Sequence, residues 1–165
     1  MKANEAVERK LKENERYVER LVRGLRQAIK KAGAKEFEFG TLHVAWNVGL
    51  IGEVFAKFGE GDKISVRELL RIIEVDLRNA IKVPLVDKLI DWYVKEYLCE
   101  EWDCCDEEDY VETDVDYERF SEEIDERAGI VKFSVDGDGE IEISAGVKDG
   151  EWGWISERVV LVPVM

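Results

Sequence analysis

The chain has 165 residues, of which 45% are hydrophobic and 38% charged, and its formal net charge is −14. The content of apolar and aromatic residues excludes an intrinsically disordered chain, and the length is that of one domain. No apolar signal-peptide core and no apolar run of 18 residues are found, so we expect no membrane contact and a cytoplasmic location. The many charged residues and the single Gln resemble the composition of hyperthermophile proteins.

The charge is distributed unevenly along the chain. Residues 1–35 hold 11 Lys and Arg against five Glu, whereas residues 100–126 hold 15 Asp and Glu against one Arg. Segments of opposite charge attract each other, either within one chain or between two chains. The acidic segment also offers a surface that a basic partner protein could bind.

The first 33 residues predict one long amphipathic helix ended by Gly33. Apolar or near-apolar residues recur at alternating spacings of three and four, as in a heptad seam. The seam consists of Val7, Leu11, Asn14, Val18, Leu21, Leu25, Ala28 and Ala32. Such a helix packs either on its own domain or against a second copy, in which case a buried Asn would fix the register. The predicted homodimer interface is Val7, Leu11, Asn14, Val18, Leu21 and Leu25.

Residues 34–98 are expected to form a helical core. Alternating Glu and Phe predict a short strand from Lys35 to Gly40, which Gly40 ends or bulges, and the apolar second half of residues 41–58 predicts a buried helix. Ser65-Val66-Arg67-Glu68 matches a capping box and predicts a helix over 66–82. Pro84 is suited to begin the next helix, over 84–98.

The C-terminal third begins with an acidic connector, residues 99–116. A short helix from Tyr117 to Ala128 follows, ended by Gly129. Alternating apolar residues then predict three strands, Ile130–Val135, Glu140–Ser144 and Trp154–Val164. The fold class is therefore α+β: a long N-terminal amphipathic helix and a helical bundle, followed by an antiparallel β-meander. The four parts, 1–33, 34–98, 99–116 and 117–165, are expected to form one compact domain.

Three groups of residues are weak candidates for chemistry. Cys99, Cys104 and Cys105 are interpreted as ordinary thiols, with a disulfide or a metal site as alternatives. Asp136, Asp138 and Glu140 recur at every second position, which suits a hard cation but equally a solvated turn. His43 lies in an apolar run and is expected to be a hydrogen-bonded core residue. No cofactor motif is found, so enzymatic activity is disfavoured, although a carboxylate-based enzyme stays open.

A helix-turn-helix with a wing is a possible interpretation of residues 66–98 and the hairpins. The second helix has too few cations to read DNA, so phosphates would instead meet the basic face of the first helix. That face comprises Arg16, Arg20, Arg23, Arg26, Lys30 and Lys31.

The leading hypothesis is a non-enzymatic interaction or regulatory protein that self-associates and presents an acidic surface. The first alternative is a nucleic-acid-binding regulator that uses the basic face. The second is an inhibitor whose acidic segment mimics a phosphate backbone.

Overall fold

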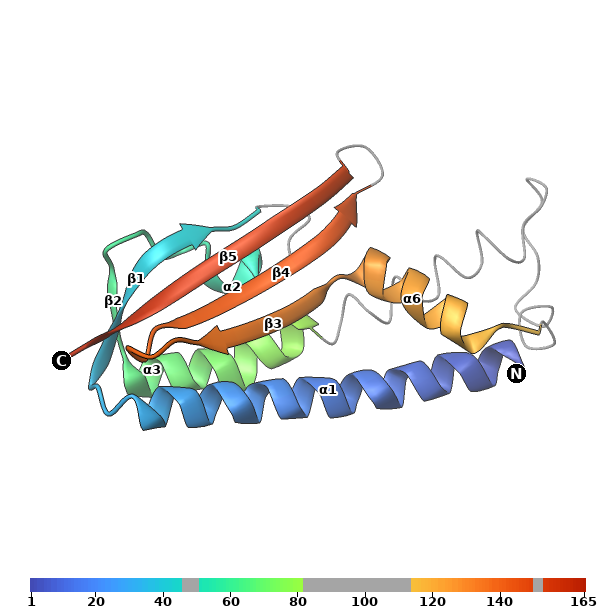
Figure 1. Ribbon diagram of the computed structural model, residues 1–165, viewed down its shortest axis with the longest axis horizontal. Coiled ribbons are helices and arrows are strands. Elements are labelled where there is room, and N and C mark those ends of the chain that lie inside the picture. The colour runs from blue at the N-terminus through green and yellow to red at the C-terminus, as the bar shows by residue number, and fades with distance from the viewer. Residues whose placement is uncertain (46–50, 82–113, 150–152) are drawn as a thin grey trace.

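The computed structural model describes residues 1–45, 51–81, 114–149 and 153–165. It confirms the α+β class, with a long N-terminal helix and an antiparallel sheet (Figure 1). The helical elements are α1 (Ala3–Lys31), α2 (Gly52–Phe55), α3 (Val66–Arg71), the π-helical stretch η1 (Ile72–Leu77) and α6 (Tyr117–Ala128). The strands are β1 (Glu36–His43), β2 (Lys63–Ser65), β3 (Ile130–Val135), β4 (Ile141–Asp149) and β5 (Gly153–Val164).

The five strands form one antiparallel sheet in the order β2-β1-β5-β4-β3. Strands β3, β4 and β5 are the predicted meander. The sheet is larger than the sequence predicted, because β1 pairs with β5 and β2 extends the sheet beyond β1. The register shifts between Phe39 and Thr41 and β1 continues to His43, so of the two predicted roles of Gly40 the structure favours a bulge over a strand end.

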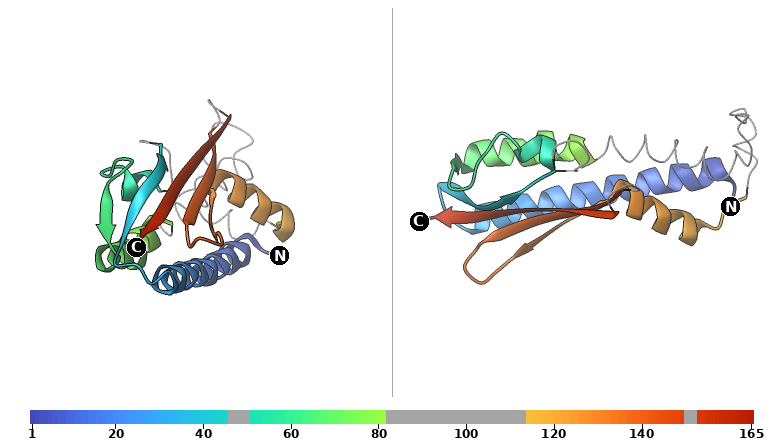
Figure 2. Two further views of the ribbon diagram at one scale, coloured as in Figure 1. Left: turned by 60° about the vertical axis from the view of Figure 1, so that its left-hand side comes forward. Right: turned by 90° about the horizontal axis from the view of Figure 1, so that it is seen from above.

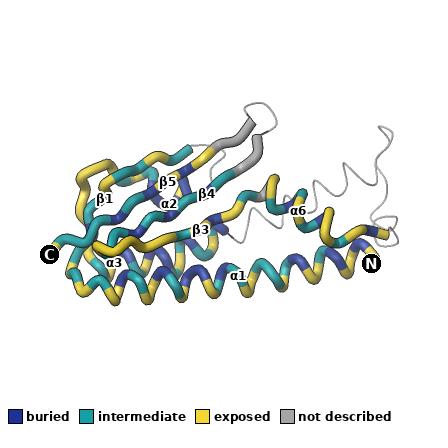
Figure 3. Tube along the Cα trace, viewed as in Figure 1, coloured by how far each residue is buried: buried dark blue, intermediate teal, exposed yellow. Residues whose placement is uncertain are grey.

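The helices α1 and α3 lie on the same side of the sheet (Figure 2). The strands turn alternate residues toward these helices, and these inward side chains are buried: Phe37, Phe39, Val131, Ile141, Ile143, Val159 and Leu161. From α1, Val18, Leu21, Leu25 and Ile29 join the same cluster. Figure 3 shows the buried positions of α1 on the side that faces the sheet.

The N-terminal part of α1 packs against α6 instead of the sheet. Ala3 and Ala6 form a second buried cluster with Val115, Phe120 and Ile124. Within the part of α1 that packs in the main cluster, Gly24 lies where a Cβ atom would come within 2.6 Å of the Phe133 ring. One long helix thus joins two separate apolar clusters, and a glycine lets it approach β3 closely.

Several local predictions are confirmed. The side chain of Ser65 accepts a hydrogen bond from the backbone N–H of Glu68 at 3.2 Å, so α3 begins at the predicted capping residue. A second cap, which was not predicted, is Asp116, whose side chain accepts a hydrogen bond from the backbone N–H of Glu118 at the start of α6. At the other end of α6, Gly129 adopts a φ of 83°.

Other predictions differ from the structure. The helix expected in the second half of residues 41–58 is a single turn, α2. The helix predicted over 66–82 is helical up to Ile81, the last described residue of this stretch, but its middle part, η1, is π-helical. His43 is exposed, so the prediction of a core histidine is wrong. The predicted helix over 84–98 and most of the acidic connector lie outside the described residues. The division into four parts therefore stays a prediction.

Candidate functional site

The exposed side of α1 carries a row of cations. Five of the six predicted basic residues form what we call the basic stripe: Arg16, Arg20, Arg23, Lys30 and Lys31. All five are exposed. Because an α-helix advances 1.5 Å per residue, the stripe extends over about 22 Å. At about 100° per residue, its members lie within an arc of about 100° on the side opposite the buried seam.

The sixth residue, Arg26, is engaged within the protein. Its Nε lies 3.2 Å from a carboxylate oxygen of Glu74 on η1. By contrast, no member of the basic stripe forms an ion pair with any residue that the structure describes. The stripe is therefore a charged surface that the described part of the fold leaves available for a partner.

Carboxylates border the stripe at its Arg16–Arg20 end. Glu15 and Glu19 lie on one flank of this end, and Glu19 contacts Arg78 at 3.2 Å. On the other flank, Glu13 accepts a hydrogen bond of 2.5 Å from the hydroxyl of Tyr117. This bond is the main reason why the pKa of Glu13 is lowered. Burial opposes the lowering, and Arg9 and Lys10 add to it. Anionic side chains therefore narrow the stripe around Arg16 and Arg20.

A groove of about 880 Å³ lies along the middle of α1. Within the described residues, its lining includes Arg16, Arg20 and Arg23 from the stripe, together with Asn14 and Tyr17. The same groove reaches Ile130 and Val131 at the start of β3. Three arginines of the stripe thus border a concave surface, which a partner could contact over a larger area than a flat helix face offers.

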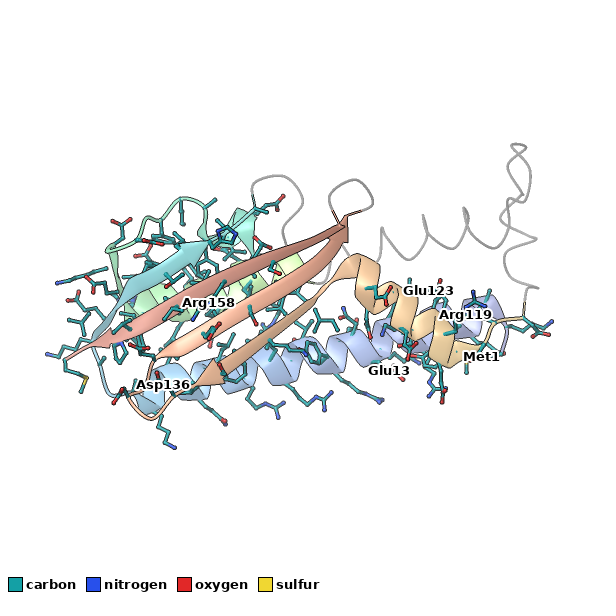
Figure 4. The ribbon with its side chains drawn as sticks, turned by 45° about the horizontal axis from the view of Figure 1, so that its top comes forward. Met1, Glu13, Arg119, Glu123, Asp136 and Arg158 are labelled. Carbon is teal, nitrogen blue, oxygen red and sulfur yellow. The ribbon has the colours of Figure 1, made fainter. Side chains whose placement is uncertain are left out.

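Buried polar contacts hold α1 in place beside α6 and β3. The ammonium group of Lys10 donates hydrogen bonds of 2.7 Å to Oγ of Ser121 and to Oδ1 of Asp125. The hydroxyl of Tyr17 donates to the backbone carbonyl of Val131, and burial raises the pKa of this phenol. Figure 4 shows Glu13 on α1 beside α6. These contacts fix the helix that carries the basic stripe.

Helix α6 carries two exposed carboxylates, which are opposite in charge to the basic stripe of α1. Glu118 and Glu122 are exposed, and within the described ranges neither side chain has an ion-pair partner. Their neighbours on α6 are engaged: Glu123 pairs with Arg119 at 3.3 Å, and Asp125 pairs with Lys10. Figure 4 shows Arg119 and Glu123 on α6. We call Glu118 and Glu122 the acidic pair.

The predicted dimer seam lies largely inside the protein. Val18, Leu21 and Leu25 belong to the main core, and the half-buried Val7 and Leu11 pack against the cluster at α6. Asn14 is half-buried and lines the groove. This placement favours the intramolecular interpretation of the seam, because three of its six side chains are already covered by the chain itself.

The predicted carboxylate site forms a turn. Oδ1 of Asp136 accepts hydrogen bonds from the backbone N–H groups of Asp138 at 2.8 Å and Glu140 at 3.0 Å. The charge of Asp136 is the main reason that the pKa of Glu140 is raised. Among the described residues, no group of three or more His, Cys, Asp or Glu side chains is arranged to hold a metal ion. The solvated-turn interpretation accounts for these residues, and Cys99, Cys104 and Cys105 lie outside the described part of the chain.

One polar residue that sequence reasoning missed is Glu157 on β5. Its side chain is only 1% exposed, and its carboxylate accepts hydrogen bonds from the N–H groups of Ala45 at 3.0 Å and Ile51 at 3.1 Å. The sequence could have predicted its buried position, because Glu157 alternates with Val159 and Leu161 on the inward face of β5. An acidic residue at an inward strand position indicates a buried polar contact.

Comparison of the chain with protein-family models, curated proteins and solved structures gave no match. Of the helices in the described ranges, none is both long enough and apolar enough to cross a membrane.

Proposed function

We propose that this chain is a non-enzymatic, cytoplasmic interaction protein that binds an acidic segment of a partner protein along the basic stripe of α1. The observation that carries this proposal is the set of five exposed cations over about 22 Å, none with an ion-pair partner among the described residues. Arginine supports such binding because its planar guanidinium group donates two parallel hydrogen bonds to one carboxylate.

An acidic protein segment fits the stripe better than a nucleic-acid duplex. The stripe is bordered at its Arg16–Arg20 end by Glu13, Glu15 and Glu19, and residues 114–149 hold twelve Asp and Glu against four Lys and Arg. At physiological salt, charges within about 8 Å are only partly screened, so these carboxylates would repel a wide polyanion. A single acidic helix or extended segment is narrow enough to follow the stripe.

The first test measures binding of a fluorescent, Glu-rich helical peptide by anisotropy at 50 mM and 300 mM NaCl. We compare the wild type with a stripe variant, Arg16→Gln/Arg20→Gln/Arg23→Gln. The stripe variant should bind at least tenfold more weakly than the wild type, and the wild-type affinity should fall as salt rises.

A matched control carries Lys63→Gln/Arg67→Gln/Lys132→Gln. These three cations are also exposed, lie outside the stripe, and change the net charge by the same amount. The control should bind the peptide within about twofold of the wild type. Equal loss in both variants would show that only net charge matters, and would overturn the proposal.

The nucleic-acid alternative is tested with a labelled DNA duplex under the same conditions. Preferential binding of the duplex, lost in the stripe variant, would favour the phosphate-binding regulator instead. The acidic-mimic hypothesis depends mainly on residues outside the described ranges, and it stays a hypothesis.

A further inference from the structure

We propose that the acidic segment that binds the basic stripe is the acidic pair of a second copy of this chain. This inference rests on the proposed function and names its partner. In such a complex, Glu118 and Glu122 on α6 of one copy meet Arg16 and Arg20 on α1 of the other.

The two surfaces match in spacing and in charge. Arg16 and Arg20 are four residues apart on α1, and Glu118 and Glu122 are four residues apart on α6. Residues with this separation lie on the same face of a helix, about 6 Å apart along its axis. All four side chains are exposed. Two helices in contact can therefore align two opposite charge pairs at the same time.

Within one copy, α1 and α6 already use other residues to contact each other. Lys10 binds Ser121 and Asp125, and Tyr117 donates to Glu13. The apolar side of α6 is buried through Phe120 and Ile124. Glu122 lies about 160° around the helix from Ile124, on the side that faces away from α1. Glu118 lies about 120° from Ile124, so both carboxylates of the acidic pair point away from the side of α6 that packs on α1.

A dimer with twofold symmetry would form the contact between the basic stripe and the acidic pair twice. In a dimer with a twofold axis, the α1–α6 contact of one copy is repeated by the other copy. Four carboxylate–guanidinium contacts then form from two residues on each helix. Exposed ion pairs are individually weak and are screened by salt, so we expect association that is concentration-dependent and reduced at high salt.

The test measures mass by sedimentation equilibrium of the full chain at 50 mM and 500 mM NaCl. Two charge-reversed variants are compared with the wild type: Arg16→Glu/Arg20→Glu and Glu118→Lys/Glu122→Lys. Each variant alone should lose at least tenfold in dimerisation constant. An equimolar mixture of the two should recover association, because both contacts in the mixed dimer again join opposite charges.

A control with Glu53→Lys/Glu68→Lys reverses two exposed carboxylates elsewhere and should dimerise within about twofold of the wild type. Circular dichroism confirms that each variant is folded. A wild-type chain that stays monomeric at 50 mM NaCl, or variants that do not recover association when mixed, would overturn the inference. If the Glu-rich peptide still binds the stripe in that case, the proposed function stands and only the identity of the partner is wrong.

Discussion

The ammonium group of Lys10 lies 2.7 Å from Oδ1 of Asp125, so α1 and α6 are joined by residues 115 positions apart in the sequence. The Lys10 side chain is 8% exposed, whereas Lys12, which lies 3.8 Å from Glu8, is 65% exposed. Lys10→Ala leaves Ser121 and Asp125 without their donor and should cost about 1–3 kcal/mol in the free energy of unfolding.

Lys12→Ala is the matched control, because it removes the same group from an exposed helix pair worth less than about 0.5 kcal/mol. Urea unfolding followed by circular dichroism measures both effects. Equal stabilities of the two variants would contradict the role assigned to Lys10.

The buried carboxylate of Glu157 should be important for stability. In Glu157→Ala, the N–H groups of Ala45 and Ile51 lose their acceptor, and each unsatisfied buried donor costs about 1–3 kcal/mol. Glu157→Gln retains one acceptor oxygen and should be less destabilising. Thermal unfolding ranks the variants, with Glu142→Ala as a control for loss of an exposed ion pair with Arg158. We expect stability to fall in the order wild type, Glu157→Gln, Glu157→Ala. A Glu157→Ala protein as stable as the Glu142→Ala control would contradict the role assigned to Glu157.

The phenol groups of Tyr17 and Tyr117 make the stability of the folded protein depend on pH in the alkaline range. Burial is the largest cause that raises the pKa of both Tyr17 and Tyr117 above the usual value near 10. The unfolded chain therefore releases these protons at a lower pH than the folded protein. The stabilisation that comes from this difference in pKa is fully present below pH 10 and is lost as the pH rises above 10.

The variant Tyr17→Phe/Tyr117→Phe tests this dependence. At pH 8 it should be less stable than the wild type by about 1 kcal/mol for each lost hydrogen bond. Between pH 10 and pH 12 the difference should shrink, since the wild type alone loses the phenol contribution. A difference that stays constant with pH would contradict the assignment.

A substitution at Leu21 tests whether the apolar seam of α1 belongs to the core of one chain or to an interface between two chains. It is 5% exposed and packs within the main core cluster. Leu21→Ala should therefore lower the free energy of unfolding by about 2–5 kcal/mol, and the loss should be the same at 2 µM and 200 µM protein. Leu11→Ala, at a half-buried position, should cost less. If the loss caused by Leu21→Ala depends on protein concentration, the seam joins two chains.

Local signals were the most predictable part of the fold. The capping residue Ser65, the helix Tyr117–Ala128 and the strand Ile130–Val135 each depend on neighbouring residues, and each was predicted within a residue or two. The pairing of β1 with β5 was not predicted, because partners far apart in sequence leave no local pattern. For the same reason, the sequence around Gly24 did not predict that the Phe133 ring lies close to this glycine.

The candidate site was only partly predictable. Helical periodicity correctly placed the cations of α1 on its exposed face, since spacing alone fixes the side of a helix. It could not show that Arg26 pairs with Glu74 while Arg16, Arg20 and Arg23 stay unpaired among the described residues. That distinction depends on η1 lying beside α1, which is a tertiary contact.

The most direct test of the central claim is to map the binding surface of a Glu-rich helical peptide by NMR. A ¹⁵N-labelled protein reports both backbone amides and arginine Nε–H groups. We predict that the largest shifts fall on Arg16, Arg20 and Arg23, and that they disappear at 500 mM NaCl. Shifts centred on Lys63, Arg67 and Lys132, or shifts spread evenly over all cations, would contradict the assignment of the basic stripe as the binding surface.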